Sequence, residues 1–144
     1  MILEFVDDIN WLALGAAVAA AFSIGVLWFS PAAFGGFWAR QVSRYSGLPE
    51  DEITREASRP HTLGRWLASI VVSAVVLAMT VEAVGASSVG EGLVLGVVLT
   101  VGFGATLASW PPIFARMPWS WWLVNSCAFL LMQVAMSVIL AAWR

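Results

Sequence analysis

WLVNSCAFLLMQVAMSVILAAW, residues 122–143, contains no charged side chain and has tryptophan at both ends. A helix of about 20 apolar residues, rising about 1.5 Å per residue, crosses the hydrocarbon core of a bilayer, about 30 Å thick. Three similar runs precede it, at residues 11–29, 66–84 and 93–110. The sequence therefore predicts an all-α integral membrane four-helix bundle, a single transmembrane domain over residues 1–144.

The composition excludes an ordinary soluble globular domain. Hydrophobic residues make up 60% of the chain, charged residues only 11%, and nine residues are Trp. The first apolar run could also be the core of a cleaved signal peptide. It is preceded by Glu4, Asp7 and Asp8, whereas a signal peptide begins with cationic residues. We therefore expect this run to remain as a membrane span.

The basic residues, which are all Arg, predict the orientation. Cationic loops stay on the cytoplasmic side of a membrane. Only Arg144 lies beyond the fourth run, so we expect both termini outside the cell and the protein in the cell membrane. The other six lie between the first and second runs, at the edge of the second, or between the third and fourth: Arg40, Arg44, Arg55, Arg59, Arg65 and Arg116.

Most tryptophans fall near the ends of the runs, where an amphipathic ring favours the lipid headgroup level. A ligand cage built of these rings is the less favoured interpretation. We expect two residues at the outer boundary, Trp11 and Trp143, and six at the inner one: Trp28, Trp66, Trp110, Trp119, Trp121 and Trp122.

The long cytoplasmic loop, residues 30–64, predicts two short helices. Pro31 should end the first span, and Gly35-Gly36 should form a second break. From Phe37 onward, apolar residues recur at helical spacing beside Arg40 and Arg44, which predicts a short interfacial helix whose arginines contact anionic headgroups. A second helix should begin at the acidic residues after Pro49. Both helices could equally act as packing lids.

The last run also carries neutral polar side chains. At about 100° per residue, Asn125, Ser126, Gln133 and Ser137 share a sector of about 120°. Polar groups in hydrocarbon need partners, so this face should look at other helices or at a small wet cavity. Hydrogen bonding between helices is the first interpretation, and a path for an uncharged solute is the second.

The third run places small residues at every fourth position, a pattern that lets another helix backbone approach closely. The first run offers a partner row in Gly15, Ala19 and Ser23. The two rows could meet within one subunit or between copies, and we expect self-association. The helix-packing residues of the third run are Gly92, Gly96, Thr100 and Gly104, with Ala108 continuing the row.

Several motifs resemble a known family. Gly25-Val26-Leu27-Trp28-Phe29-Ser30-Pro31 is similar to the N-terminal signature of the bacterial and archaeal membrane family called domain of unknown function 1761. Gly102-Phe103-Gly104-Ala105-Thr106-Leu107, and Pro118-Trp119 with Leu123-Val124-Asn125, resemble its second half. The resemblance implies a small four-span protein and brings no activity. An aromatic-His pair that often follows the Asn in this family is replaced here by Ala128-Phe129.

The first and third spans also end alike, with Trp28 and Pro31 in one and Trp110 and Pro111 in the other. The two helical hairpins could be a parallel repeat, or the boundary residues could coincide by chance.

The sequence suggests no catalytic group, no metal site and no cofactor. It contains one Cys and one His, without the spacing of a nucleophile and base or of a ligand set. Cys127 should be ordinary packing. We expect membrane lipids and further copies of the chain as partners, and no nucleic acid.

Three functions follow as hypotheses. The first is a self-associating, non-enzymatic scaffold or accessory subunit. The second is a facilitative transporter or channel for a small uncharged or weakly polar solute. The third is a membrane enzyme that uses Arg59, His61 and Arg65 on an anionic lipid headgroup at the inner interface.

Overall fold

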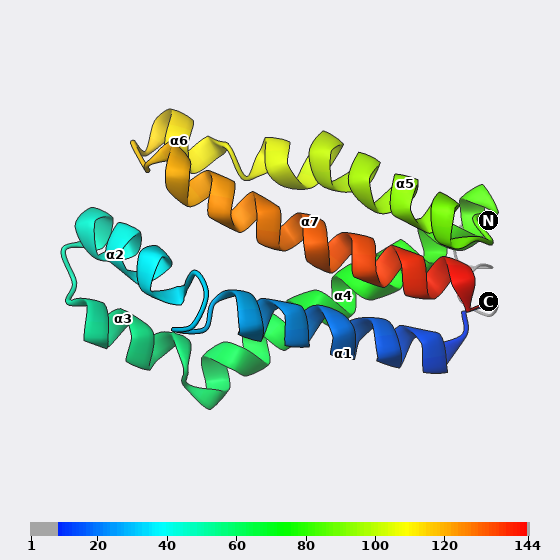
Figure 1. The fold of residues 1–144 in the computed structure, drawn as a ribbon, viewed down its shortest axis with the longest axis horizontal. Helices are drawn as coiled ribbons and strands as arrows, with labels where there is room; N and C mark the ends of the chain where they lie inside the picture. Colours follow the sequence, from blue (N-terminus) through cyan, green and yellow to red (C-terminus); the bar gives the residue numbers. More distant parts are fainter. Residues whose placement is uncertain (1–8, 144) are drawn as a thin grey trace.

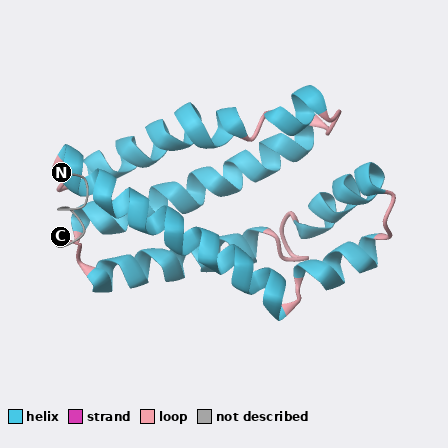
Figure 2. Cartoon of the chain, turned by 180° about the vertical axis from the view of Figure 1, so that it is seen from behind, coloured by secondary structure: helices cyan, strands magenta, loops and turns pink. Residues whose placement is uncertain are grey.

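The computed structural model describes residues 9–143, and all of its described regular elements are helices (Figures 1 and 2). Glu4, Asp7, Asp8 and Arg144, which entered the predictions above, lie outside these residues. The elements are α1 (Trp11–Trp28), α2 (Gly35–Ser46), α3 (Glu50–Ala57), α4 (Pro60–Val84), α5 (Val89–Leu99), the π-helix η2 (Thr100–Ala105), α6 (Trp110–Phe114) and α7 (Trp119–Ala142).

Four helical segments are long and apolar enough to cross a membrane, which confirms the predicted all-α fold class. They are Trp11–Trp28, Pro60–Val84, Val89–Phe114 and Trp119–Ala142. The chain is thus a multi-pass membrane protein with a short helix, α2, in the connection between its first two spans.

Three spans begin earlier than the apolar runs. The first turn of a helix is stabilised by polar groups, and a run chosen by its hydropathy leaves such residues out. At the start of α5, the Ser88 hydroxyl accepts the Glu91 N–H at 3.3 Å, and the Glu91 carboxylate accepts the Ser87 N–H at 2.7 Å. α4 begins at Pro60, whose missing N–H costs nothing at a helix start.

The apolar run at 93–110 predicts one continuous α-helix, but the third span is divided into three elements. α5 ends at Leu99, η2 occupies the middle of the span, and α6 follows after a short turn. A π-helix has i→i+5 hydrogen bonds and holds more residues per turn than an α-helix. Residues four apart before η2 therefore do not stay on one face after it.

α7 is the central helix of the bundle. It packs on α1 and α5 along most of its length and on α4 over a shorter stretch, and Figure 1 shows it running between α5 and α1. On the α1 side the core contains Ala13, Ala17 and Ala21, all fully buried. Gly25 continues this row, and a side chain there would overlap the Trp66 ring from α4. The buried row of α1 is therefore not Gly15, Ala19 and Ser23, which are all exposed.

α2 and α3 pack on each other and project from one end of the bundle as a helical hairpin (Figure 1). The prediction that Gly35-Gly36 breaks the chain was wrong. The chain reverses before them, with the Phe34 N–H donating to the Trp28 carbonyl at 2.9 Å and the Gly35 N–H to the Ser30 carbonyl at 3.0 Å. Both glycines then form the first turn of α2. Glycine is needed at position 35, because a side chain there would overlap the Phe29 and Ser30 carbonyls.

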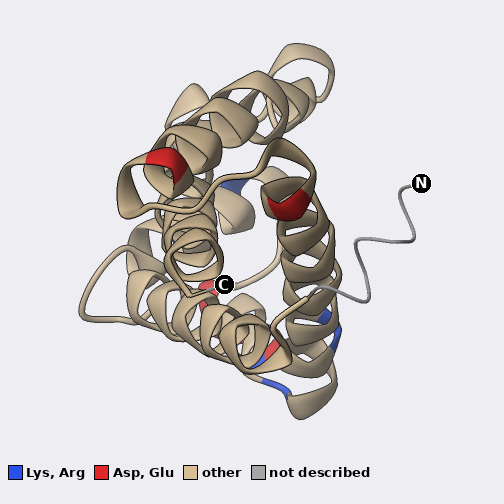
Figure 3. Ribbon diagram, turned by 90° about the vertical axis from the view of Figure 1, so that its right-hand side faces the viewer, with Lys and Arg blue, Asp and Glu red and all other residues tan. Residues whose placement is uncertain are grey.

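The charged residues are few (Figure 3), and the basic ones that the structure describes gather at one end of the bundle, together with the acidic residues of α3. The end at which α1 begins and α7 finishes also holds the α4–α5 turn, with Glu82 and Glu91 beside it; here the Asn10 side chain donates to the Trp143 carbonyl at 3.2 Å. The opposite end holds α2, α3, the start of α4, and α6. Every Arg between Arg40 and Arg116 lies at that opposite end.

Candidate functional site

The polar residues of α7 divide between two neighbouring helices. Ser126 and Gln133 are two helical turns apart and so lie on one stripe, with Ser137 one turn further on. Gly96 of α5 lies against the Gln133 carbonyl and the Ser137 hydroxyl, which places this stripe on the α5 side. Asn125 is two turns before Met132, whose sulfur lies close to Gly25 of α1, so Asn125 lies on the α1 side.

The small residues of α5 face this stripe within the same chain. A Cβ at Gly92 would lie 2.6 Å from the Ser137 carbonyl oxygen, and one at Gly96 would lie 2.8 Å from the Val134 Cα. Real Cβ atoms do not approach other atoms to within 3.0 Å. Glycine at both positions is therefore what allows the backbones of α5 and α7 to touch, as in other small-residue helix contacts.

Gly104 does not belong to this contact, although the strict four-residue spacing predicted it. A Cβ there would meet only the Thr100 side chain of the same span, at 3.7 Å. The extra residue of η2 brings the next position, Ala105, toward α7 instead. The Trp122 indole N–H donates to the Ala105 carbonyl at 2.8 Å and fixes this register.

We call Thr100, Ser126, Gln133 and Ser137 the polar seam. Two of its members are satisfied by their own helices: the Thr100 hydroxyl donates to the Gly96 carbonyl at 2.7 Å, and the Ser137 hydroxyl donates to the Gln133 carbonyl at 2.8 Å. Thr100 is 2% exposed and Ser137 is fully buried.

The other two members are not satisfied. The Ser126 Oγ and the Gln133 Oε1 are buried and have no hydrogen-bond partner among the described residues, and the whole Ser126 residue is only 8% exposed. In a hydrocarbon environment an unpaired polar atom is costly, and such atoms usually bond to a neighbouring chain, a water or a ligand. The polar seam thus offers two unused hydrogen-bonding groups in the middle part of the bundle.

Asn125 is buried and donates to the Trp121 carbonyl, one turn earlier in α7, at 2.7 Å. The Trp121 indole nitrogen is itself buried and unpaired among the described residues. Asn125 and Trp121 therefore form a second polar group, on the side of α7 that faces α1 and away from the polar seam.

Two tryptophans have a packing role in addition to their predicted place near the membrane boundary. The Trp28 indole donates to the Val124 carbonyl at 3.2 Å, which links α1 to α7, as Trp122 links α7 to η2. The sequence pattern alone does not connect Trp122 with the polar seam. Its position one helical turn before Ser126 was the available signal.

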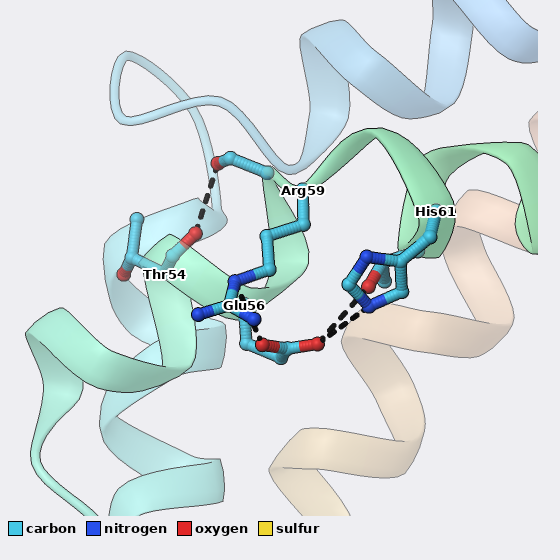
Figure 4. Close-up of polar contacts among 6 residues, drawn as sticks. Thr54, Glu56, Arg59 and His61 are labelled. Carbon is cyan, nitrogen blue, oxygen red and sulfur yellow. Dashed lines mark hydrogen bonds and ion pairs between the residues drawn. The ribbon is translucent and has the colours of Figure 1, made fainter.

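At the end of the bundle that carries the arginines, polar side chains form a cluster at the α3–α4 corner (Figure 4). The Glu56 carboxylate lies 3.1 Å from the Arg59 Nε and 3.0 Å from the His61 Nε2, and it accepts a hydrogen bond from the Thr62 hydroxyl at 3.3 Å. Partial desolvation raises the pKa of Glu56, but the hydrogen bond with His61 and the charge of Arg59 outweigh it, so the pKa is lowered from its ordinary value.

Glu56 was not singled out from the sequence, although its spacing of three from Arg59 is typical of a helical ion pair. Arg59 and His61, two of the residues in the enzyme hypothesis, both contact this carboxylate, and Arg65 is exposed outside the cluster. These contacts link the end of α3 to the start of α4, and the anion that Arg59 and His61 contact is the Glu56 carboxylate.

Arg40 and Arg44 are both exposed on α2, where they were predicted to meet anionic headgroups. The Arg40 guanidinium lies back along the helix, 3.6 Å from the position of a Cβ on Gly36. Among the described residues, no three His, Cys, Asp or Glu side chains form a group that could hold a metal ion. Cys127 is a free, partly buried thiol.

Comparison with known proteins gives one match. A family model described as "Protein of unknown function (DUF1761)" matches residues 12–141, nearly the whole described chain. No curated protein and no solved structure matches the chain.

Proposed function

The chain belongs to the DUF1761 family, and we propose that it binds small uncharged solutes at the polar seam and lets them cross the membrane without energy coupling. The observation that carries the proposal is the pair of buried, unpaired acceptors, Ser126 Oγ and Gln133 Oε1. A solute with O–H or N–H groups satisfies them. An ion is disfavoured, because no charged side chain lies near the middle of any span to offset its desolvation.

The spacing of these atoms supports passage by steps. Ser126 and Gln133 are seven residues apart on α7, about 10 Å along the helix axis. A small molecule meets one acceptor and then the other, with neither binding it tightly.

The orientation is part of the proposal. We propose that the protein lies in the cell membrane with the end that carries α2, α3 and α6 in the cytoplasm, because the six arginines between Arg40 and Arg116 gather there. Both termini are then outside. In a Cys127→Ala background, a thiol reagent that cannot cross membranes should label Ser58→Cys only after the cells are opened, and labelling of intact cells would reverse the orientation.

Flux into vesicles tests the function. We expect vesicles that contain the protein to swell faster than protein-free vesicles in glycerol or urea gradients, measured by stopped-flow light scattering. Gln133→Leu should return the rate to that of protein-free vesicles. Ser23→Ala, which removes a hydroxyl from the exposed face of α1, is the matched control and should leave the rate unchanged. Rates equal to those of protein-free vesicles for water, glycerol and urea would exclude the proposal.

Self-association as a scaffold is a second candidate, and a different observation supports it. Gly15, Ala19 and Ser23 form an exposed small-residue row on α1, and the position of a Cβ on Gly15 meets nothing within 4 Å. Such a row suits a second helix from another copy. Substitution of Gly15 and Ala19 by Leu should then shift native mass spectra toward monomer, and an unchanged spectrum would dismiss this interface.

A further inference from the structure

Both α5 and η2 pack on α7, with Gly96 against the Ser137 hydroxyl and Ala105 hydrogen-bonded to Trp122, so the proposed function requires a part of the protein that moves. We infer that η2 is the gate of the polar seam: residues 100–105 rewind from π to α winding and withdraw from Ser126. This inference rests on the proposed function for its purpose, but its test does not depend on any solute.

The position of η2 suits a gate. It lies in the middle of the Val89–Phe114 span, and π-turns within membrane or soluble helices frequently occur at functional sites. On its N-terminal side, α5 is held against α7 by the backbone contacts of Gly92 and Gly96. On its C-terminal side, one side-chain hydrogen bond, from Trp122 to the Ala105 carbonyl, holds the register.

Within η2 there is room for the change of winding. A Cβ on Gly102 would meet nothing within 4 Å, and one on Gly104 would meet only Thr100 of the same span. The Thr106 hydroxyl donates to the Val101 carbonyl at 2.8 Å, five residues earlier, a bond that spans the widened turn. No contact with α7 from Gly102 or Gly104 has to break for the turn to rewind.

Rewinding has a definite geometric result. An α-helix advances about 100° per residue, so absorbing the extra residue of η2 rotates the inner half of the third span by about that angle. Ala105 then leaves α7, and the Trp122 hydrogen bond breaks. α5 stays in place, because Gly92 and Gly96 hold it against α7.

Chemical labelling of the polar seam tests the gate. In a Cys127→Ala background, Ser126→Cys places the only thiol of the protein at the seam. We expect N-ethylmaleimide to modify it slowly but measurably in reconstituted vesicles. Deletion of Gly102 removes the extra residue, keeps Ala105 on the α7 side with ordinary α winding, and should slow the modification at least tenfold.

Two further variants make the result decisive. Gly102→Ala keeps the residue count and adds a methyl group in open space, so it should not slow the modification as the deletion does. Trp122→Phe removes the indole N–H from Ala105 and should raise the rate severalfold. If the deletion variant does not fold, the Trp122→Phe rate alone decides.

Equal rates in all variants, or no modification of the parent, would overturn the gate. Solute flux is measured separately. If labelling follows the expected order but no solute flux is found, the gate stands and the proposed function is excluded. If flux is found but the labelling rates are equal, the proposed function stands and the gate is excluded.

Discussion

The contact between α5 and α7 should be destabilised by a single methyl group at Gly96. In Gly96→Ala the new Cβ would lie 2.8 Å from the Val134 Cα and closer still to the Ser137 hydroxyl. Ordinary contacts begin near 3.4 Å, so the two backbones must separate by about 0.6 Å at this point. The Val134 atom belongs to the backbone of a central helix and cannot turn aside.

The size of the effect follows from a matched pair of variants. Replacing Gly by Ala inside a helix gains up to about 1 kcal/mol in helix propensity. Gly64→Ala on α4 has this gain and no clash, because nothing lies within 4 Å of its Cβ position. The difference between the two variants therefore isolates overpacking, which costs about 1–3 kcal/mol. We expect Gly96→Ala to be less stable than Gly64→Ala by this amount.

Unfolding in mixed micelles with increasing denaturing detergent, followed by circular dichroism, measures both free energies of unfolding. The midpoint of Gly96→Ala should fall below that of the parent, and the midpoint of Gly64→Ala should not. Equal midpoints for the two variants would refute the backbone contact between α5 and α7. In that case the small-residue row of α5 would have to serve another purpose.

Three other predictions use the same purified protein. Gln133→Met removes a buried, unpaired acceptor and should stabilise the solute-free protein by about 1–3 kcal/mol in the detergent assay; a lower midpoint would mean that the acceptor has a partner. Trp28→Phe loses the hydrogen bond to the Val124 carbonyl and should cost about 0.5–1.5 kcal/mol, with an unchanged midpoint as the contrary result. The lowered pKa of Glu56 means that its contacts stabilise the α3–α4 corner above the ordinary carboxyl pKa, about 4.3, and that this stabilisation is lost as the pH falls through the lowered pKa. Hydrogen exchange at that corner should therefore speed up, relative to the intrinsic rate, in acid in the parent but not in Glu56→Gln, and an equal response in both would exclude the carboxylate as the cause.

The spans were predictable because apolar length is a property of local sequence. The start of α5 was not predictable in this way. By hydropathy Glu91 marks the end of the apolar run, but in the structure its carboxylate accepts hydrogen bonds from the Ser87 N–H and the Ser88 hydroxyl and so caps the first turn of the helix. The four-residue row of the third span lies against α7 at Gly92 and Gly96. Its failure at Gly104 arises from η2, because helical-wheel arithmetic assumes a constant number of residues per turn.

The candidate site was predictable only in part. Periodicity placed Asn125 and Ser126 on one broad face, but a sector of about 120° is wide enough to meet two different helices. Which neighbour each residue meets depends on how α1 and α5 pack around α7, and no local pattern contains that information. The contacts of Trp28 and Trp122 were missed for the same reason, because an indole near a membrane boundary has a sufficient local explanation.

The central place of α7 has a consequence for the biogenesis of the protein. α7 is the last of the four spans to leave the ribosome, yet α5 has its extensive contact with α7 and not with α1 or α4. During synthesis α1 and α4 can pair early, whereas the third span must wait in the lipid, or against the insertion machinery, with Gly92, Gly96 and Thr100 uncovered. Assembly of this bundle is therefore completed only after translation of the last span. A ribosome stalled before α7 emerges should hold a chain whose third span is still accessible to lipid-phase crosslinkers.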